Sequence, residues 1–518
     1  MTCFPVCLPA LRPLRLASLL LSASVLSACA VGPDYVRPQQ DVGEAFKAQT
    51  LPGWSVAQPA DHLLRGPWWT LYGDPVLSDL MMQLEAGNQT VAQAEANYRA
   101  AIATLRNTRS GLFPTVGVNS GVTRSGSGRS STTFSDGEAF TRAGSSANTQ
   151  YSLQGTVSWE VDLWGRVRRA VQADEADALS SAGTLASTRL SQQSTLAQTY
   201  FQLRITDELD RLFERTVATF ERSLRLTRNR YEAGLSPRVD VAVAQTQLDN
   251  ARATLLDLTQ QRALLENALA LLIGQPPARF SLSPVAFEAQ VPDIPVGLPS
   301  TLLERRPDVA AAERTVQAAN ARIGVAQAAW FPTLTLSAGG GWRSTDFAEW
   351  LSVPARFWTL GPQLAATLFD AGARRAQVEQ ARANYDSQAA AYRQTVLVAL
   401  REVEDAMTTL SVQSDTQVLR LQALESARLS LRLTRNQFDE GLISYLDVAT
   451  LENNALAAER DALNVVQSRL LASVQLIAAL GGGWQTAQID DTSLPVQGPA
   501  AVTNRDMVRP DAPRQSVE

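Results

Sequence analysis

The sequence is poor in the side chains on which most catalytic and metal sites depend. It contains 518 residues but only one histidine, His62, and three cysteines. Cys3 and Cys7 are expected to leave with a signal peptide, so the mature chain keeps only Cys29 and forms no intrachain disulfide. One histidine and one cysteine offer no recognisable catalytic thiol–imidazole pair and no cluster of metal ligands. No motif marks a catalytic carboxylate pair. We therefore expect no enzyme, no metal and no cofactor beyond a covalent lipid.

Lysine is almost absent, because Lys47 is the only one among 46 basic residues, and the net charge is −5. This mildly acidic balance argues against nucleic acid as a partner. Two small clusters also lack the context of a binding site. Met81 and Met82 are too few to indicate copper or silver and are better explained by packing, and the glycines at 481–483 lack the strand and helix of a phosphate-binding loop.

The N-terminal apolar run, residues 16–28, is too short to span a bilayer and follows a basic flank, as in a secretory signal. It ends in Leu-Ser-Ala-Cys, which resembles a bacterial lipobox with Cys29 as the lipidated residue. An ordinary signal with a chance cysteine is the alternative. By similarity to sorted lipoproteins, Ala30 after the cysteine favours the outer membrane. A lipid anchor alone holds marginally, so a second attachment to the membrane is expected.

The chain contains two copies of one unit. Residues 226–241 read LTRNRYEAGLSPRVDV and residues 433–448 read LTRNQFDEGLISYLDV, and half of these positions are identical at a constant offset of 207. Upstream, LFPTV at 112–116 pairs with WFPTL at 330–334. The first copy holds about eleven extra residues between these anchors. They fall in the Ser/Gly-rich stretch Ser125–Asn148, which we expect to be a surface loop.

The residue pattern of each copy predicts the same elements in the same order. These are a helix, an apolar stretch opening with Phe-Pro, a β-hairpin, a very long helix, a glycine-centred turn and a last helix. The helices are expected at Val76–Ser110, Arg166–Glu232 and Val239–Ile273, and again at Thr301–Ala329, Ala373–Asp439 and Leu446–Leu480. A helix of about 67 residues extends about 100 Å, and the two shorter helices of each copy match it when stacked end to end. These lengths favour a tall helical cylinder over a compact bundle.

The hairpins provide the argument for a membrane. Alternating residues such as Val116, Val118 and Val122 suit strands, and each copy offers two segments of roughly the 9–11 residues that a transmembrane strand needs. Four strands cannot close a barrel, and lipid tolerates no open sheet edge. The chain must then oligomerise: a trimer pools 12 strands, whereas the eight of a dimer would be filled by side chains. An aromatic cluster suits an interfacial belt, with packing in a soluble core as the alternative; it comprises Trp342, Phe347, Trp350, Phe357 and Trp358.

Several segments together resemble the TolC-type outer-membrane efflux family, in particular its NodT-like lipoprotein branch. They are CAVGPDYVRP at 29–38, LLERRPDV at 302–309, IGVAQAAWFP at 323–332 and both glycine-centred turns, and they span nearly all of the mature chain. The resemblance implies a mostly α-helical, internally duplicated protein with a membrane β-barrel. It implies a homotrimer whose 12-stranded barrel continues into a long periplasmic α-helical barrel, girdled by an equatorial domain.

As function, the resemblance implies the outer-membrane channel of a tripartite efflux pump, a passive duct for small molecules such as drugs. The implied partners are a periplasmic adaptor (membrane fusion) protein and a proton-driven inner-membrane transporter. The implied location is the outer membrane, with a lipid anchor on Cys29 and a body that extends into the periplasm. The outer-membrane duct of type I protein or peptide secretion uses the same fold and is the alternative; a lipid-anchored scaffold without a pore is a more distant one. The transporter chooses the cargo, so this chain does not encode it.

The resemblance also places functional residues by position. The turns at Gly234 and Gly441 become the periplasmic tips of helical hairpins, where glycine suits a positive φ and where an adaptor makes contact. Asp240 and Asp447 follow six residues later, in the family's aperture region, and in a trimer they form rings of carboxylates that attract cations. Capping of the following helices is the alternative role for both aspartates, and the two roles can coexist.

Leu446 and Phe438 add an apolar collar to this constriction. Some family members hold the aperture shut with an arginine two residues after the second tip glycine, where this sequence has Ile443. Arg238 in the first copy is a candidate substitute, so the sequence does not decide which residue, if any, locks the aperture. Six converging carboxylates predict a small, cation-selective conductance that weakens as the pH falls through the carboxylate range.

The repeats set the boundaries of the expected domains. These are a signal peptide (1–28), an N-terminal anchor and equatorial segment (29–75), a first repeat (76–275), a linker or equatorial segment (276–300), a second repeat (301–484) and a polar C-terminal tail (485–518). Each repeat holds its own hairpin, long helix and tip, so the predicted duct is built twice over within one chain.

Overall fold

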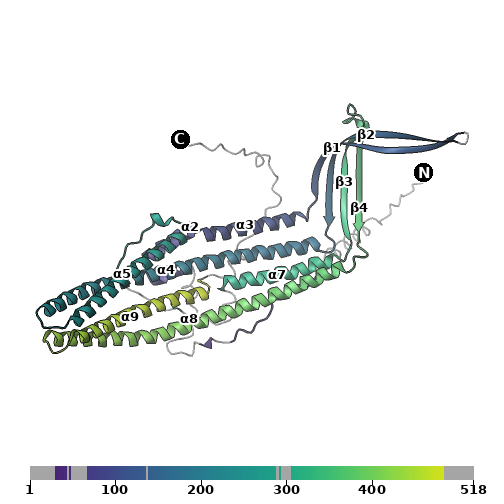
Figure 1. Cartoon of the computed structure of the whole chain (residues 1–518). Helices are drawn as coiled ribbons and strands as arrows, with labels where there is room; N and C mark the ends of the chain where they lie inside the picture. The colour runs from purple at the N-terminus through teal and green to yellow at the C-terminus, as the bar shows by residue number, and fades with distance from the viewer. Residues whose placement is uncertain are drawn as a thin grey trace, which may run out of the picture.

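The computed structural model describes residues 30–43, 46–47, 67–135, 138–287, 291–292, 294 and 305–483. They form a long helical shaft with a four-stranded sheet projecting from one end (Figure 1). The predicted signal peptide, Cys29, His62 and the C-terminal tail lie outside the described residues. The mostly helical, duplicated architecture with four strands confirms the predicted fold class.

The two longest helices run the length of the shaft. α4 (Arg166–Glu232) and α8 (Ala373–Asp439) contain 67 residues each and begin and end at the predicted residues. Each follows a glycine with positive φ, Gly165 at 80° and Gly372 at 93°, because the chain turns sharply there from strand into helix. The two glycines are equivalent in the repeat, so the duplication of sequence is a duplication of structure.

Shorter helices complete the shaft. They are α2 (Pro75–Gly87), α3 (Gln89–Ser110), α5 (Arg238–Leu272), α7 (Pro307–Ala328) and α9 (Tyr445–Ala479), with 3-10 turns η3 (Trp68–Tyr72), η4 (Pro277–Arg279) and η5 (Val353–Ala355). The last helix of each repeat ends against the backbone of an earlier segment, at equivalent positions in the two repeats. A Cβ on Gly274 would lie 2.0 Å from the carbonyl oxygen of Gly87, and one on Gly481 would lie 1.8 Å from that of Arg305. Both contacts therefore require glycine. The end of α5 meets the break between α2 and α3, so the stacked pairs are α5 with α3 and α9 with α7. The predicted stacking is confirmed, but each pair holds 35 and 22 helical residues, 57 in all, and does not match the 67-residue helix as expected.

The predicted helix Val76–Ser110 is interrupted at Asn88, whose backbone is extended (φ −68°, ψ 119°). The Asn88 side chain accepts a hydrogen bond from the backbone N–H of Val91 and so caps α3. Its amide group also donates to the carbonyl of Leu272 at 2.7 Å. The prediction of a single helix is wrong because this break depends on a partner 184 residues along the chain, which no local pattern reveals.

The main hydrophobic core lies midway along the shaft, where α2, α4 and α9 meet. Trp68 and Phe201 are among its fully buried side chains. Met81 is fully buried in this core, whereas Met82 is 62% exposed, so the two methionines do not face a common site. Among the described helices, α9 alone is long and apolar enough to cross a bilayer, but half of that stretch is buried within the molecule, as in a core helix.

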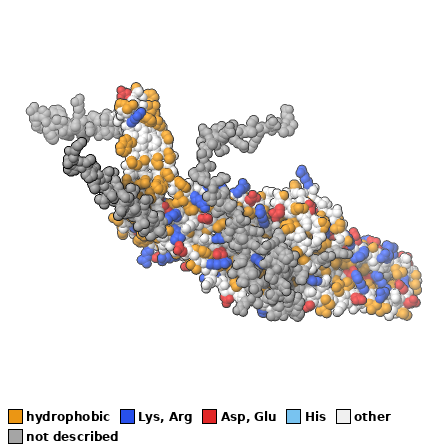
Figure 2. All heavy atoms as spheres, turned by 180° about the vertical axis from the view of Figure 1, so that it is seen from behind, with side chains coloured by type: hydrophobic (Ala, Val, Ile, Leu, Met, Phe, Trp, Pro, Cys, Tyr) orange, Lys and Arg blue, Asp and Glu red, His pale blue; other side chains and the backbone are white. Residues whose placement is uncertain are grey.

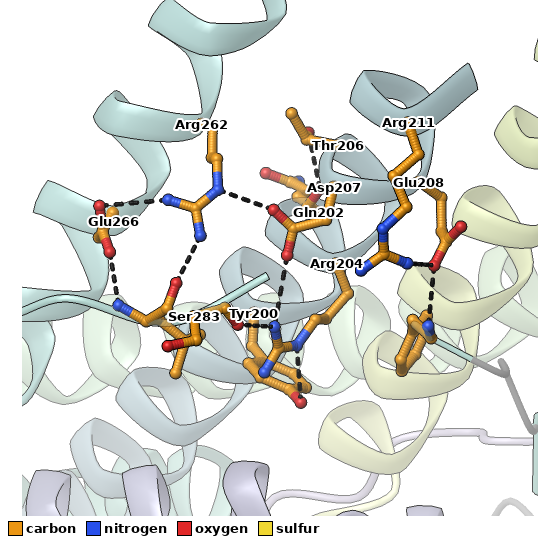
Figure 3. A network of polar contacts seen from close by, with 12 residues as sticks. Tyr200, Gln202, Arg204, Thr206, Asp207, Glu208, Arg211, Arg262, Glu266 and Ser283 are labelled. Carbon is orange, nitrogen blue, oxygen red and sulfur yellow. Dashed lines mark hydrogen bonds and ion pairs between the residues drawn. The ribbon is translucent and has the colours of Figure 1, made fainter. Parts of the chain in front are cut away.

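A buried polar network holds the segment after α5 against the shaft (Figure 3). At its centre, the fully buried carboxylate of Asp207 pairs with Arg204 at 3.3 Å and with Arg262 at 2.8 Å. The same guanidinium groups donate to backbone carbonyls, Arg204 to Ser283 at 3.0 Å and Arg262 to Leu282. Charged side chains of α4 and α5 thus fix a connecting segment by its backbone.

The network also reaches the start of α2. The hydroxyl of Tyr200 accepts a hydrogen bond from Arg204 at 3.0 Å and donates at 2.5 Å to Asp74, which caps α2. Burial raises the pKa of Tyr200, so this hydroxyl stays a neutral donor. In the second repeat, the positions equivalent to the central arginine and aspartate hold Ser411 and Ser414. The ion pair at the centre of the network is therefore a property of the first half alone.

The sheet is antiparallel, with the strand order β1-β2-β3-β4. Its strands are β1 (Thr115–Ser135), β2 (Glu138–Val161), β3 (Thr333–Ser344) and β4 (Arg356–Ala365). β1 and β2 are about twice as long as the other two, and their distal halves pair with each other beyond β3 (Figure 1). The prediction of Ser125–Asn148 as a surface loop is therefore wrong. Small polar residues have little strand propensity of their own, but backbone pairing across the hairpin runs from Ser125–Asn148 to Ser135–Glu138.

Candidate functional site

Both helical hairpins end in the same glycine turn, at the end of the shaft far from the sheet (Figure 1). Gly234 and Gly441 have φ values of 73° and 75°, and a Cβ at either position would meet no atom within 4 Å. Glycine is needed there for its backbone conformation and not for space. The next residues, Leu235 and Leu442, donate their amide hydrogens back to the last helical turn, which closes a Schellman motif. Both leucines are largely exposed, at 77% and 74%, so each tip presents an apolar side chain to solvent.

The two aspartates predicted at the aperture differ in exposure. Asp240, in the first turn of α5, is 6% exposed and accepts a hydrogen bond from the hydroxyl of Ser236 at 3.0 Å. Asp447, in the first turn of α9, is exposed and forms a capping box with Ser444. The backbone N–H and the hydroxyl of Ser444 donate to its carboxylate at 3.2 and 2.8 Å. Asp447 therefore caps the start of α9, whereas the carboxylate of Asp240 accepts no hydrogen bond from a backbone N–H at the start of α5 within the described residues. Only Asp447 presents its carboxylate to solvent.

The two residues predicted to form an apolar collar are also placed differently. Leu446 is 55% exposed, whereas Phe438 is 7% exposed and packs edge-to-face against Tyr445, with 5.8 Å between ring centroids. Phe438 belongs to a hydrophobic cluster that joins the two hairpins near their ends, here called the tip cluster. Its buried members are Phe220, Leu224, Ala244, Leu248, Ala251, Phe438, Tyr445, Val448 and Ala449. Leu446 is thus the collar residue that the structure leaves available to an aperture.

Polar contacts between the hairpins reinforce the tip cluster. Arg230 of α4 lies over the ring of Phe438 in α8, 4.3 Å from its centroid, and donates to the Phe438 carbonyl at 3.3 Å. The buried hydroxyl of Tyr445 donates to Gln247 at 3.0 Å, and burial raises the pKa of this tyrosine. These residues had no local signal in the sequence, because each partner lies on the other hairpin. The nearest available signal is that the repeat does not preserve them: Tyr445 is equivalent to Arg238.

The position of an arginine lock is occupied by an apolar residue. Ile443 packs against the tip cluster. Arg238, the candidate substitute, is exposed and makes no ion pair within the described part of the chain. Within this part of the chain, Arg238 therefore has no partner for a lock.

At the other end of the shaft, the sheet has one apolar and one polar face. The register aligns Val116, Val157, Ala338 and Leu360 across the four strands, and one residue further along it aligns Gly117, Thr156, Gly339 and Thr359. Successive side chains point to opposite faces, so these two rows lie back to back. Apolar side chains are highly exposed, including Val116 at 76% and Trp358 at 79%, and Figure 2 shows hydrophobic side chains spread over the sheet. An apolar face of this kind suits lipid, and a face of small polar residues suits an aqueous lumen.

Aromatic side chains gather at both ends of the apolar face. Far from the helices, Tyr151 packs against Phe347, with ring centroids 5.3 Å apart, and near the helices Trp164 stacks on Phe331 at 4.7 Å. Eight residue steps along β2 separate Trp159, at the near end, from Tyr151, which amounts to about 27 Å. At a strand tilt of about 35–45°, this length spans about 19–22 Å along the membrane normal, slightly less than the ~25 Å apolar band of outer-membrane barrels, which aromatic residues flank on both sides.

The predicted aromatic belt is partly wrong. Trp342 and Trp358 lie on the apolar face, as an interfacial belt requires. Phe357 lies on the polar face, where the guanidinium of Arg343 sits 4.5 Å from its ring centroid. Strand alternation separates residues 357 and 358, which adjacency in the sequence had grouped together.

The first described residues are held beside the helix-proximal aromatics. The backbone N–H of Val31 donates to the carbonyl of Trp164 at 3.0 Å, and Arg169 of α4 donates to the carbonyl of Val31 at 3.2 Å. Arg169 also pairs with Asp34 at 3.2 Å. The chain that follows Cys29 is thus fixed at the base of the apolar face.

Comparisons with known proteins agree with this geometry. A sequence model of the family described as "Outer membrane efflux protein" matches residues 80–275 and 298–482. The antibiotic efflux pump outer membrane protein ArpC of Pseudomonas putida is 30% identical over 478 residues, which cover 91% of this chain and 97% of the relative. The toluene efflux pump outer membrane protein TtgC, also of Pseudomonas putida, matches with the same identity and coverage. The cation efflux system protein CusC of Escherichia coli is 26% identical over 464 residues, 89% of this chain and 97% of the relative.

Solved structures have the same fold. The outer-membrane channel OprN superimposes with a TM-score of 0.80 at 28% identity, covering 88% of this chain and all of that one. The open state of the Neisseria gonorrhoeae MtrE outer membrane channel gives a TM-score of 0.76 at 27% identity, covering 88% of this chain and 99% of that one. The shaft and sheet described above are therefore those of outer-membrane channels.

Proposed function

This chain belongs to the outer membrane efflux protein family, and we propose that it forms the outer-membrane duct of a tripartite efflux pump. It is the outer-membrane component of an efflux pump, and it acts by conduction and not by catalysis, as its family of channels does. One observation carries the proposed duct. A sheet with one apolar face, one polar face and two free edges is joined to helices of 67 residues, long enough to continue a membrane pore far into the periplasm.

The free edges of the sheet support a trimer. Within the described residues, β1 and β4 each have one unpaired edge. Unpaired backbone groups are costly in lipid, so the sheet must pair with copies of itself. Three copies give 12 strands and room for an aqueous path, whereas eight strands would leave a filled barrel. In the closed ring, β4 of one protomer lies beside β1 of the next.

We expect the purified protein to be a trimer in detergent. Native mass spectrometry should give three times the mass of the mature chain. With Val118→Cys in β1 and Leu360→Cys in β4, a flexible thiol-reactive crosslinker should link protomers into trimers, because the two edge strands meet across each seam. Val157→Cys in the central strand β2 is the control and should give no intermolecular link. A folded monomer in detergent would contradict the duct.

We propose small molecules as the cargo, in the class of antibiotics and organic solvents. The names of two relatives at 30% identity point to an antibiotic and to toluene. All the relatives described above are named as efflux proteins, which supports this reading over the alternative of protein or peptide secretion. The choice among small molecules belongs to the inner-membrane transporter, which we expect to be proton-driven.

We propose the hairpin tips as the contact for the periplasmic adaptor. The exposed Leu235 and Leu442 occupy equivalent positions in the two repeats and offer six apolar contacts in a trimer. We expect Leu235→Asp combined with Leu442→Asp to reduce efflux close to that of cells without the chain, because a buried interface tolerates no unpaired carboxylate. Drug susceptibility and crosslinking to the adaptor are the measurements. Leu235→Met with Leu442→Met should keep near-normal efflux, and normal efflux in the aspartate variant would refute this contact.

We propose that Cys29 carries the lipid anchor. The lipobox spacing supports this, and so does the docking of Val31 beside Trp164, where a lipid on the preceding cysteine enters the nearest membrane leaflet. We expect mass spectrometry of the mature N-terminus to find diacylglycerol on Cys29. The Cys29→Ser variant should lack that mass. An unmodified mature chain that starts at another residue would rule the anchor out.

A further inference from the structure

Charged side chains are rare in the sheet and unevenly placed. Where the strands have described side chains, they contain four: Arg124, Glu160, Arg343 and Arg356. By the two-residue alternation along each strand, Glu160 and Arg343 belong to the polar face, and Arg124 and Arg356 belong to the apolar face. A guanidinium group on a lipid-facing surface is costly unless it meets an anionic or polar partner.

Both arginines of the apolar face lie at its helix-distal end. Arg356 pairs in register with Trp342, and Arg124 lies two residues beyond Val122, which pairs with Tyr151. They therefore border the distal aromatic cluster, where hydrocarbon gives way to lipid headgroups. Both side chains are exposed, and neither guanidinium group makes an ion pair or hydrogen bond within the described residues.

The edge positions of these arginines bring two protomers together. Arg124 is on β1 and Arg356 is on β4, the two strands with free edges. In the proposed trimer, on which this inference rests, Arg356 of one protomer and Arg124 of the next flank the same seam. Val31, close after the proposed anchor residue Cys29, is held against Trp164 at the opposite end of the sheet. A lipid on Cys29 then enters the periplasmic leaflet, so the seam arginines reach the outer leaflet.

We propose that Arg124 and Arg356 form, at each seam, a binding site for the phosphate groups of a phosphorylated glycolipid of the outer leaflet. Guanidinium groups bind phosphate through paired, charge-assisted hydrogen bonds, and two of them match a headgroup with two phosphates. The loop between β3 and β4 beyond the belt also carries Asp346 and Glu349, and Asp346 accepts the backbone N–H of Ala348 at 2.9 Å. The region is thus not uniformly basic, and the place of the two arginines on the apolar face is what distinguishes them.

Native mass spectrometry of the purified trimer tests this site. Three probes are compared: diphosphorylated lipid A, lipid A with both phosphates removed, and inorganic phosphate. A basic residue near an anionic membrane surface contributes a factor of about five in affinity. We expect Arg124→Gln and Arg356→Gln to weaken binding of the diphosphorylated lipid about fivefold each, and about 25-fold together. Arg343→Gln on the polar face is the matched control and should leave the affinity unchanged.

The outcomes separate this site from the duct itself. If no trimer is seen, the proposed duct fails and the site fails with it. If the trimer forms but wild-type protein binds both lipids equally, or inorganic phosphate displaces the lipid at equal concentration, only the lipid site is overturned. An equal loss in Arg343→Gln would also overturn it, because a general loss of positive charge would then explain the effect.

Discussion

Replacing Asp207 by alanine is expected to destabilise the protein by about 3–5 kcal/mol, because the change leaves the buried guanidinium group of Arg204 and the half-buried one of Arg262 without their shared carboxylate. The Asp207 side chain is fully buried, and Arg204 beside it is 1% exposed. Arg262 pairs with the other carboxylate oxygen at 2.8 Å. Both arginines also hold carbonyls of the segment after α5, so their displacement should release that segment as well.

The midpoint of urea unfolding, followed by helical circular dichroism at fixed protein concentration, measures this effect. Glu221→Ala is the control, because Glu221 pairs with Arg252 at 2.7 Å but both side chains are substantially exposed, at 36% and 50%. That variant should lose less than about 1 kcal/mol. Limited proteolysis should also cut Asp207→Ala faster near residues 280–287. Equal shifts in the two variants would show that the buried network contributes no more than a surface pair.

Asp447→Asn is expected to remove most of the cation selectivity of the reconstituted channel. In a trimer, Asp447 would supply three exposed carboxylates around one axis. At a separation of about 7 Å from a central cation, each would contribute roughly 0.6 kcal/mol in water, enough together for an enrichment of cations of about twentyfold before salt screening. Asparagine keeps an oxygen that accepts the hydrogen bonds from Ser444, so the start of α9 should survive the change. The helix tip then stays folded while the charge is lost.

Reversal potentials in a planar bilayer under a salt gradient provide the measurement. Wild-type selectivity should weaken at acid pH, and Asp447→Asn should be weakly selective at every pH. Asp240→Asn is the informative comparison, because Asp240 is 6% exposed and hydrogen-bonded to Ser236; it should change selectivity little. If Asp447→Asn keeps wild-type selectivity, Asp447 is a helix cap only and the constriction lies elsewhere.

The ends of the long helices were predictable to the residue because each boundary is marked by a nearby glycine and because the same pattern occurs in both repeats. Gly165 and Gly372 start them, and Gly234 and Gly441 lie just past their ends, each with a positive φ that glycine adopts readily. Features that depend on distant partners were not predictable in this way. The break at Asn88 depends on a hydrogen bond to the Leu272 carbonyl. The distal half of the β1–β2 hairpin depends on backbone pairing, which its small polar residues do not indicate.

The candidate site shows the same division. Asp240 and Asp447 occupy equivalent positions in the repeat, so nothing in the spacing distinguishes the buried one from the exposed one. The sequence position of Phe438 predicts a collar residue, whereas in the structure Arg230 and Tyr445 pack against its ring. The apolar face of the sheet was foreseen from alternation at Val116, while its full width appears only when four strands are aligned.

Every strand of the sheet continues into one helix, α3 into β1, β2 into α4, α7 into β3 and β4 into α8. Tilted strands occupy about 6 Å of a barrel's circumference each, whereas packed helices need about 8–10 Å. A closed ring with equal numbers of both must flare by a factor of about 1.4 as it leaves the membrane. The flare falls on four short connectors, two with Phe-Pro at Pro114 and Pro332 and two with glycine at Gly165 and Gly372. The backbone geometry of these four connectors, more than any pore-lining side chain, sets how much the conduit widens between the sheet and the helices.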